Sequence, residues 1–407
     1  MKHLGMQGIL LAASAPAIVH QSAYANTLTD LIPDLYAGLD VVSRELVGYI
    51  PSVNRNTGVE RAAVGEAVRW PVVGAMGTFN VTPAMAIPEP ADRVVGNGTM
   101  TITHAEGVDF GWTGEEQKGL NNGPGMLSIQ ADFFAQGLRT LVNKIEAHVG
   151  TVAYARASRA VGTAGTAPFS GTDLEDAALV RQILDDNGAP PERSVVVNTS
   201  AGVKLRKHAQ LSKANEAGST MTLRQGELLD IFGLSFKESA GVPTHTKGTG
   251  ASATTNTTGY PVGSTTIALA SAGTGTIKAG DVITFAGDTN KYVVKTGDAD
   301  VSGGGSIVLN EPGLRQAIPA AATAITVGNS YAANLAFSRN AIGLAIRPPA
   351  LPQGGDAAVD SMILTDERSG MSFEVRLYAG YRKIRAEVAA AWGAEAIKPE
   401  HIALLLG

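Results

Sequence analysis

Apolar positions along the chain change their period several times, and each change predicts a different element. The longest helical pattern covers residues 126–161, where apolar side chains recur at spacings of three and four and no proline interrupts them. The stripe consists of Ile129, Phe133, Phe134, Leu138, Leu141, Val142, Ile145, Val149 and Val152. Such a helix would be about 50 Å long, so we expect it to span the molecule rather than one small domain.

The chain before this helix combines a short helical pattern with β-rich pieces. Residues 27–50 have nearly helical spacing, with Thr29 or Asp30 as a candidate cap. Residues 66–113 form apolar runs separated by a proline-rich stretch and a Gly-Asn-Gly turn, which predicts a long two-stranded excursion. A hairpin without its own core is marginal alone and needs a surface to lie on.

The chain after the long helix predicts first an α/β unit and then a run of short strands. We expect a helix over 172–187 capped by Thr172 or Asp173, a strand over 194–198, and a second helix capped by Thr199 or Ser200. From about residue 249 to 330 the composition shifts to Gly, Ser, Thr and Ala with regularly spaced short β runs, which is typical of a small barrel or sandwich.

This second region has enough apolar residues for a small core of its own. The candidate inward-facing set is Ile267, Leu269, Val282, Ile283, Phe285, Val293, Val294, Ile307 and Leu309. Ordinary composition resumes near residue 330, so the region reads as a module inserted between the halves of another domain.

Composition excludes several classes of protein. The chain has 407 residues, no cysteine, 32 basic and 37 acidic residues and a formal net charge of −5. Disulfides and thiolate chemistry are therefore excluded, and no basic block is present to follow a nucleic-acid backbone. Charged residues make up only 17% and hydrophobic residues 44%, so the chain must bury much apolar surface within itself or against neighbours.

The N-terminus has some features of a secretory signal. Lys2 and His3 precede an apolar stretch over residues 9–19, and residues 23–25 have the small-residue character of a cleavage site. Pro16 interrupts the apolar stretch, which favours retention of the segment. No apolar run approaches the ~20 residues of a membrane-spanning helix.

The order of these elements resembles that of tailed-bacteriophage major capsid (coat) proteins, in the subgroup with an inserted β-barrel domain. The resemblance covers most of the chain and includes IKAGDVITFAG (277–287), YAANLAFSRNAIGLAIRP (331–348) and YRKIRAEVAAAWGAEAIKPEHIALLL (381–406). It implies an α+β fold with an N-terminal arm, a long β-hairpin loop, a long spine helix, an α/β axial lobe and the inserted small β-barrel.

The resemblance also implies where the domains lie. An N-terminal arm covers residues 1–60, and an extended two-stranded loop covers 61–118. A peripheral domain with the spine helix covers 119–170 and is completed by about 355–390. An axial α/β domain covers 171–248 and is completed by about 331–354 and 391–407, and the inserted β-barrel domain covers 249–330.

The implied function is structural. The resemblance implies a subunit that self-assembles, as hexamers and pentamers, into an icosahedral shell enclosing the DNA genome, without catalytic activity or a cofactor. Its implied partners are further copies of itself, a scaffolding protein and a portal, with non-specific contact to packaged DNA, no membrane, and a decoration protein left open. The virion capsid is the implied location, with assembly in the host cytoplasm. Candidate assembly residues are Trp70, Phe79, Pro88, Pro90, Arg139 and Arg156.

The sequence contains only weak candidates for catalytic or metal-binding sites. The seven histidines are scattered, with no pair at metal-ligand spacing on one helix. Asp281, Asp288, Asp298 and Asp300 invite a calcium interpretation, but the terminal bidentate glutamate is missing and turn formation is favoured. Ser200 follows a strand as a hydrolase nucleophile would, yet the first glycine of that motif is absent, which favours a helix cap.

Two other functional classes remain open at this point. A secreted or surface-attached β-rich binding protein would explain the signal-like N-terminus and the Gly/Thr-rich module, but not the uninterrupted helical pattern over 126–161. An enzyme would require an acid, a base and a nucleophile in one place, and the sequence groups no such set.

Overall fold

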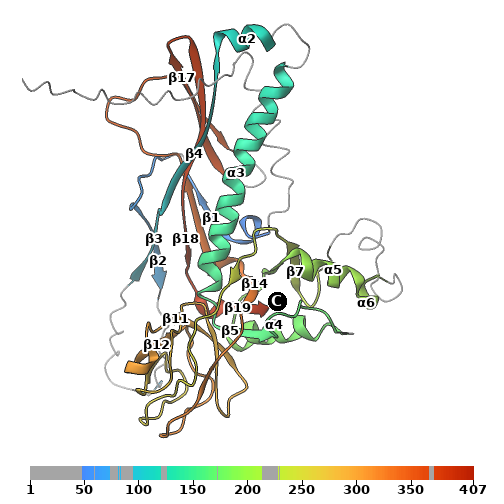
Figure 1. Cartoon of the computed structure of the whole chain (residues 1–407), viewed down its shortest axis with the longest axis vertical. Coiled ribbons are helices and arrows are strands. Elements are labelled where there is room, and N and C mark those ends of the chain that lie inside the picture. Colours follow the sequence, from blue (N-terminus) through green and yellow to red (C-terminus); the bar gives the residue numbers. More distant parts are fainter. Residues whose placement is uncertain are drawn as a thin grey trace, which may run out of the picture.

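The computed structural model describes residues 48–58, 60–73, 81, 83, 95–120, 126–171, 173–212, 228, 230–365 and 371–407. Most of the helix predicted over 27–50 and the tip of the predicted hairpin lie outside these residues. The body is elongated, and one long helix runs along much of it (Figure 1). A lobe of short helices and a group of short strands lie at the lower end in that view.

The long helix is α3, Met126–Tyr154, and its length matches that of strand β18, Lys383–Ala396. At 29 residues the helix is about 43 Å long, and at 14 residues the strand is about 46 Å long. The buried face of α3 includes Phe134, Leu138, Leu141, Val142, Ile145 and Val149, as the apolar stripe predicts. It packs against β18, β4 and β14.

The helix ends seven residues earlier than predicted. Residues 159–162 instead form strand β5, Arg159–Gly162, which pairs in parallel with the C-terminal strand β19, Ile402–Leu406. The pairing joins segments more than 240 residues apart, so local periodicity contained no signal for it. The tertiary pairing overrides the helical pattern here.

A six-stranded sheet covers α3. Its strands are β1 Asn54–Thr57, β15 Ile342–Arg347, β18, β17 Ser372–Gly380, β16 Ala358–Thr365 and β4 His104–Thr113. Strand β18 pairs with β17 along residues 383–389, with β15 along 391–396 and with β4 along 383–392. A single long strand therefore holds the sheet together.

The predicted two-stranded excursion is shorter than expected. Strands β2, Ala67–Val73, and β3, Val95–Thr101, form the antiparallel hairpin β2–β3. The remainder of the predicted range, strand β4, belongs to the six-stranded sheet through β18. This partner strand lies almost 280 residues further along the chain, and a local β-rich pattern does not show so distant a partner. The prediction that β4 belongs to the hairpin was therefore wrong. Beyond β4, the short helix α2 covers Gly114–Leu120.

The second large sheet carries the α/β lobe. Its lobe strands are β5, β19, β14 Tyr331–Ser338, β6 Arg193–Val197, β7 Leu234–Glu238 and the short β8 Thr244–His245. The helices of this lobe are α4 Glu175–Asp186, α5 Thr199–Lys207 and α6 Ala209–Ser212. Single 3-10 turns lie at η1 Ile50–Ser52, η2 Val301–Gly303, η3 Arg339–Ala341 and η4 Pro399–His401.

The helix caps of the lobe differ by one or two positions from the predictions. Asn198, rather than Thr199 or Ser200, caps α5, and its side chain accepts a hydrogen bond from the backbone N–H of Ala201 at 2.8 Å. At α4 the cap position is Leu174, without a side-chain cap bond. The predicted end of α4 at Asn187 is correct, and the following Gly188 has φ of 69°, a conformation that glycine adopts without strain.

The strands of residues 249–330 pair in a continuous series. The order is β9 Thr266–Leu269, β12 Gly305–Leu309, β11 Lys291–Thr296, β10 Val282–Phe285 and β13 Ile325–Val327. The segment 253–256 hydrogen bonds to both ends of this series: Ile325 N–H donates to Ala253 O, and Asn256 N–H donates to Ala268 O. The series therefore returns on itself.

Seven of the nine predicted inward-facing residues form a separate cluster, with Ile283, Phe285 and Ile307 at its centre. Val282 and Val293 instead belong to the main core beneath α3. Consecutive side chains in a strand point to opposite faces, so neighbours Val282 and Ile283 cannot both face the small core. The outer face of β10 and β11 is buried because Val282 and Val293 pack in the main core.

The entry and exit of this segment lie side by side. Strand β8 pairs with β14 so that His245 is opposite Tyr331, and Lys247 N–H donates to Ser330 Oγ at 3.1 Å. At the same place His245 Nε2 lies 2.8 Å from the buried Asp281 carboxylate. Asp281 also accepts hydrogen bonds from the backbone N–H groups of Gly248 and Lys278.

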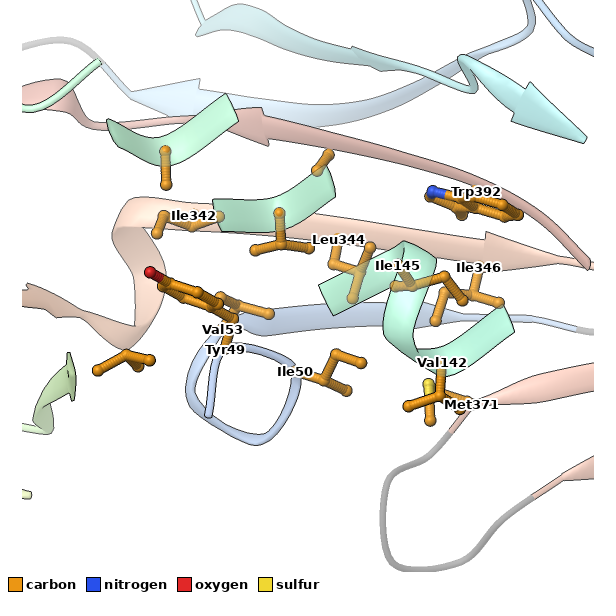
Figure 2. Close-up of a cluster of buried hydrophobic side chains, with 14 of the residues drawn as sticks. Tyr49, Ile50, Val53, Val142, Ile145, Ile342, Leu344, Ile346, Met371 and Trp392 are labelled. Carbon is orange, nitrogen blue, oxygen red and sulfur yellow. The ribbon is translucent and has the colours of Figure 1, made fainter. Parts of the chain in front are cut away.

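The N-terminal turn of the described chain is built into the main core. Figure 2 shows Tyr49, Ile50 and Val53 among the side chains of α3 and β15. The buried Glu146 carboxylate of α3 accepts hydrogen bonds from the backbone N–H groups of residues 48, 49 and 50 at 2.6, 2.8 and 3.0 Å. It also accepts one from Ser239 Oγ at 2.7 Å. One side chain thus joins the helix, the N-terminal turn and the lobe.

Leu138 tests the orientation of α3. Its side chain is fully buried in the main core, so the Leu138→Ala variant should lose about 2 to 5 kcal/mol of unfolding free energy. Chemical denaturation of unassembled subunits measures this loss. The exposed Gln136 on the same helix provides the control, because Gln136→Ala should change stability by less than about 0.5 kcal/mol. Equal effects of the two substitutions would contradict the packing described.

Candidate assembly interface

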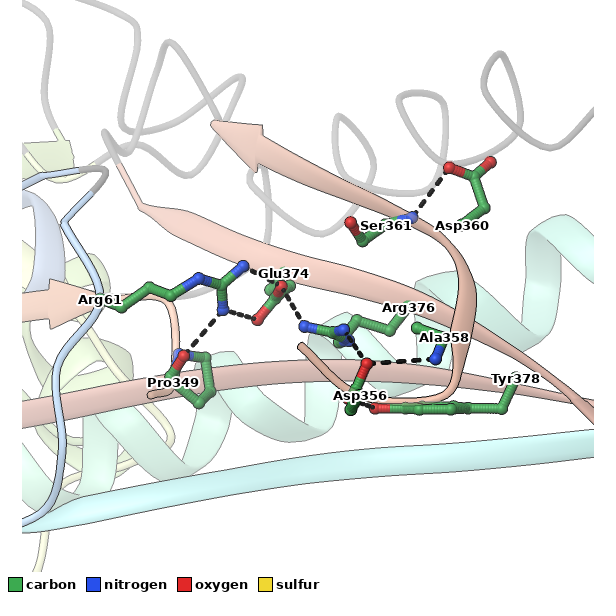
Figure 3. Close-up of polar contacts among 9 residues, drawn as sticks. All are labelled: Arg61, Pro349, Asp356, Ala358, Asp360, Ser361, Glu374, Arg376 and Tyr378. Carbon is green, nitrogen blue, oxygen red and sulfur yellow. Dashed lines mark hydrogen bonds and ion pairs between the residues drawn. The ribbon is translucent and has the colours of Figure 1, made fainter. Parts of the chain in front are cut away.

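The root of hairpin β2–β3 is fixed to the six-stranded sheet by an ion pair between the partly exposed Arg61 and the buried Glu374, shown in Figure 3. Arg61 donates from Nη1 and Nη2 to the two carboxylate oxygens of Glu374 on β17, at 2.8 and 2.6 Å. Arg61 Nη1 also donates to Pro349 O at 2.9 Å. Glu374 is only 1% exposed. We call this group the Arg61 clamp.

A second arginine extends the clamp along β17. Arg376 Nη1 donates to Glu374 at 3.0 Å, and Arg376 Nη2 donates to Asp356. Tyr378 donates its hydroxyl to the other oxygen of Asp356 at 2.9 Å. The hydrogen bond with Glu374 raises the pKa of Arg61, so its guanidinium stays charged. Bidentate pairing of this kind fixes direction as well as distance.

The clamp has a mechanical consequence for the hairpin. Arg61 lies six residues before β2, and backbone bonds at Ala62 join the same segment to the residues after β15, because Ala62 N–H donates to Pro348 O at 3.0 Å. The hairpin therefore leaves the body in a fixed direction. A rigid root is what an arm needs in order to reach a defined place on another molecule.

The predicted assembly residues fall in different places. Trp70 lies in β2 with its ring against Gly98 of β3, and Phe79, Pro88 and Pro90 lie outside the described residues. Of these four candidate residues, the described structure therefore places Trp70 alone. Arg139 is half-buried on α3 and lies apart from the hairpin.

Arg156 has a partner within its own chain. Its Nη2 lies 3.7 Å from Glu395 of β18, and both side chains are partly exposed. This candidate assembly residue thus has an acidic neighbour in its own chain. A pair of this exposure contributes at most about 1 kcal/mol.

Two histidines meet between the sheet and α3. His104 of β4 stacks on Trp392 of β18 with ring centroids 5.2 Å apart, and its ring lies 4.4 Å from that of His148 of α3. Burial, with a smaller contribution from His104, lowers the pKa of His148 to about 4. The ring is therefore neutral at physiological pH. Sequence spacing did not predict this contact between His104 and His148. The contact arises because β4 pairs with β18.

Exposed apolar side chains mark two further surfaces. Tyr381, at the turn between β17 and β18, is 90% exposed, and Arg382 lies over its ring at 5.9 Å. Val359 on the outer strand β16 is 71% exposed. Tyr and Arg are enriched at the centres of protein interfaces, so the β17–β18 turn is a candidate contact surface that the sequence analysis missed.

The candidate metal and nucleophile sites do not assemble. Asp298 and Asp300 accept hydrogen bonds from backbone N–H groups two residues further on, as turn-forming residues do. Within the described part of the chain, no group of three or more histidine and acidic residues is arranged to hold a metal ion. The same part contains no helix long and apolar enough to cross a membrane.

Comparisons with known proteins find similarity in solved structures alone. No family model and no curated protein matches the chain. Similar solved structures include the capsid of the cyanophage P-SCSP1u, with 14% identity, coverage of 97% of this chain and 93% of that chain, and a TM-score of 0.47. The capsid of a native GTA particle has 12% identity, coverage of 98% and 99%, and a TM-score of 0.43.

A virus-like particle from Pyrococcus furiosus has 10% identity, coverage of 93% of this chain and 100% of that chain, and a TM-score of 0.43. All three are described as capsids or virus-like particles.

The Arg61 clamp can be tested by removing its carboxylate. Glu374→Ala leaves two guanidinium groups without their buried partner, so we expect a loss of about 3 to 5 kcal/mol in unfolding free energy. Lys144→Ala is the matched control, because it removes an exposed pair with Glu106 and should cost at most about 1 kcal/mol. Denaturation of unassembled subunits compares the two. A similar small loss in both variants would show that the clamp does not hold the hairpin root.

His148 predicts a pH dependence of stability. Its pKa is lowered in the folded protein from 6.5 to about 4, so the unfolded chain binds the proton more readily. The contribution of His148 is complete above about pH 6.5 and is lost as the pH falls towards about 4. His148→Gln should therefore flatten the decline of unfolding free energy over this range, whereas Gln136→Ala should keep the wild-type slope. An unchanged slope in His148→Gln would mean that the two rings separate in solution.

Proposed function

We propose that this chain is the major capsid subunit of a tailed-phage-type shell, which self-assembles around a DNA genome. The observation that carries the proposal is the hairpin β2–β3. The Arg61 clamp and the packing of Met100, Val68 and Trp70 fix its base to the body, whereas β2 and β3 pair with no other described strand. Beyond this base, a two-stranded arm is marginal alone and gains stability on a neighbouring surface.

The elongated body supports the same function. Helix α3 and strand β18 form a stiff beam of about 43 to 46 Å, and the exposed Tyr381 lies at the β17–β18 turn. A low fraction of charged residues is expected for a surface that neighbours cover.

We further propose that residues 249–330 are an inserted β-barrel domain. The series β9-β12-β11-β10-β13 and its return through residues 253–256 support a closed barrel, and the separate apolar cluster supports its own core. The adjacent entry and exit at His245 and Tyr331 are what insertion requires. The remaining boundaries follow the sequence proposal, namely arm 1–60, extended loop 61–118, peripheral domain 119–170 with about 355–390, and axial domain 171–248 with about 331–354 and 391–407. The exception is β4, which we assign to the peripheral domain because it pairs with β18.

The partners follow from the proposed role. They are further copies in hexamers and pentamers, a scaffolding protein, a portal and packaged DNA held by non-specific contact, with assembly in the host cytoplasm. A secreted β-rich binding protein is not favoured, because it gives no role to a beam and a rooted arm. Catalysis is not part of the proposal.

Removal of the hairpin tip tests the assembly role. Replacing residues 75–93 with a short Gly–Ser linker keeps β2 and β3 but removes the segment that would lie on a neighbour. We expect a soluble subunit with wild-type circular dichroism that forms no closed shells, because the contact between subunits is lost. Electron microscopy of the wild type and the variant provides the comparison. Normal shells from the variant would refute this role for the hairpin.

Expression of the inserted segment alone tests its independence. The fragment 246–331 includes the closing segment 253–256 and both adjoining ends. It should unfold in one cooperative transition and give dispersed β-type amide signals, because the contacts of its small core lie within it. The fragment 260–331, which lacks the closing segment, is the control and should be less stable. A disordered longer fragment would make the segment dependent on its pairing with β5.

A further inference from the structure

We propose that a cleft beside the hairpin root is a docking site for an extended acidic peptide segment of a partner protein. The cleft has a volume of about 650 Å³ and lies between strand β1 and the strands β2 and β3. Residues 54–57 form one side, and Trp70, Gly98 and Met100 form the other. This inference concerns the unassembled subunit and does not depend on shell formation.

The charged and polar residues that line the cleft indicate which kind of ligand it favours. Arg55 and Lys398 line it together with the amide side chains of Asn54, Asn56 and Asn340, and none of its described lining residues is acidic. A lining with this excess of donors and positive charge favours a ligand that carries carboxylates.

Two buried donors beside the cleft have no acceptor among the described residues. Trp70 Nε1 lies against Gly98, and Arg347 Nη1 lies beside Gly58, next to the hydrogen bond from Arg347 Nη2 to Asn56 at 2.8 Å. Buried donors in native proteins nearly always have a partner. An acceptor-rich segment in the cleft would bring carbonyl and carboxylate oxygens to these two positions.

The backbone of β1 favours a peptide over a nucleic acid. Strand β1 pairs with β15 on one side, and no described strand pairs with its other edge. Its four residues present about 13 Å of edge to which an extended segment can add as a strand. Met100 and Ile397 offer an apolar contact for an alternate side chain. A single-stranded nucleic acid would use several stacking aromatic rings, whereas Trp70 is the one aromatic residue of the described lining.

Binding of a labelled peptide to the full-length unassembled subunit tests the proposal. The probe is a short fluorescein-labelled peptide of alternating glutamate and valine, and the matched probe replaces each glutamate with lysine. We expect fluorescence anisotropy to detect binding of the acidic probe alone. Hydrogen exchange should show protection of the amides of residues 54–57 on binding, because these form the new strand pair.

Charge reversal identifies the site. Lys398→Glu should weaken binding of the acidic probe at least about tenfold, because a like charge replaces an attractive one in the cleft. Lys383→Glu, at the far β17–β18 turn, should leave it unchanged. Circular dichroism confirms that both variants fold, and the milder Lys398→Gln should give an intermediate loss.

Three results would overturn the proposal. They are no binding of the acidic probe, equal binding by Lys398→Glu, and stronger binding of a single-stranded oligonucleotide that the peptide does not displace. Binding of the acidic probe only after deletion of residues 1–47 would assign the cleft to this chain's own N-terminal segment instead of a partner. Shell formation by electron microscopy is measured separately, so its failure is distinguishable from failure of peptide binding.

Discussion

The burial of one long helix face is the constraint on which the rest of this structure depends. Helix α3 presents an apolar stripe about 43 Å long. The stripe would be exposed to water unless an element of similar length packed against it. Strand β18 has that length and carries β17, β15 and β4 along its two edges. The six-stranded sheet and the helix therefore stabilise each other, and neither would have a core without the other.

Charges buried at two points fix the remaining segments to this beam. Glu146 holds the N-terminal turn and the lobe to α3 through three backbone N–H groups and Ser239. Glu374 holds the hairpin root through Arg61. A buried carboxylate is costly unless hydrogen bonds satisfy it, so both sites strongly favour one arrangement of the joined segments. Helix α3 and strand β18 make the body stiff, and these two carboxylates fix the orientation of the segments joined to it.

Residues 249–330 contact the rest of the chain more closely than a module on a linker would. Its inner core is separate, but β11 pairs with β5, and Val282 and Val293 complete the main core. Asp281 and His245 connect the segment to its own entry. Movement of the segment as a unit would break these contacts, so the structure couples its position to the end of α3.

The sequence by itself determined the elements whose signals are local. Three- and four-residue spacing identified α3 and its buried face, Asn187 marked the end of α4, and strand alternation with glycine-rich turns identified the segment 249–330. Each of these features depends on side chains within a few turns of one another, and their spacing records which face is buried.

Only the tertiary structure decided which distant segments meet. It ended α3 at Tyr154 because β5 pairs with β19, it moved β4 from the hairpin to β18, and it turned Val282 and Val293 towards the main core. It also brought Arg61 to Glu374, 313 residues away, and His104 to His148. Local periodicity specifies that a residue is buried but not what buries it, because the partner is chosen by packing over the whole chain.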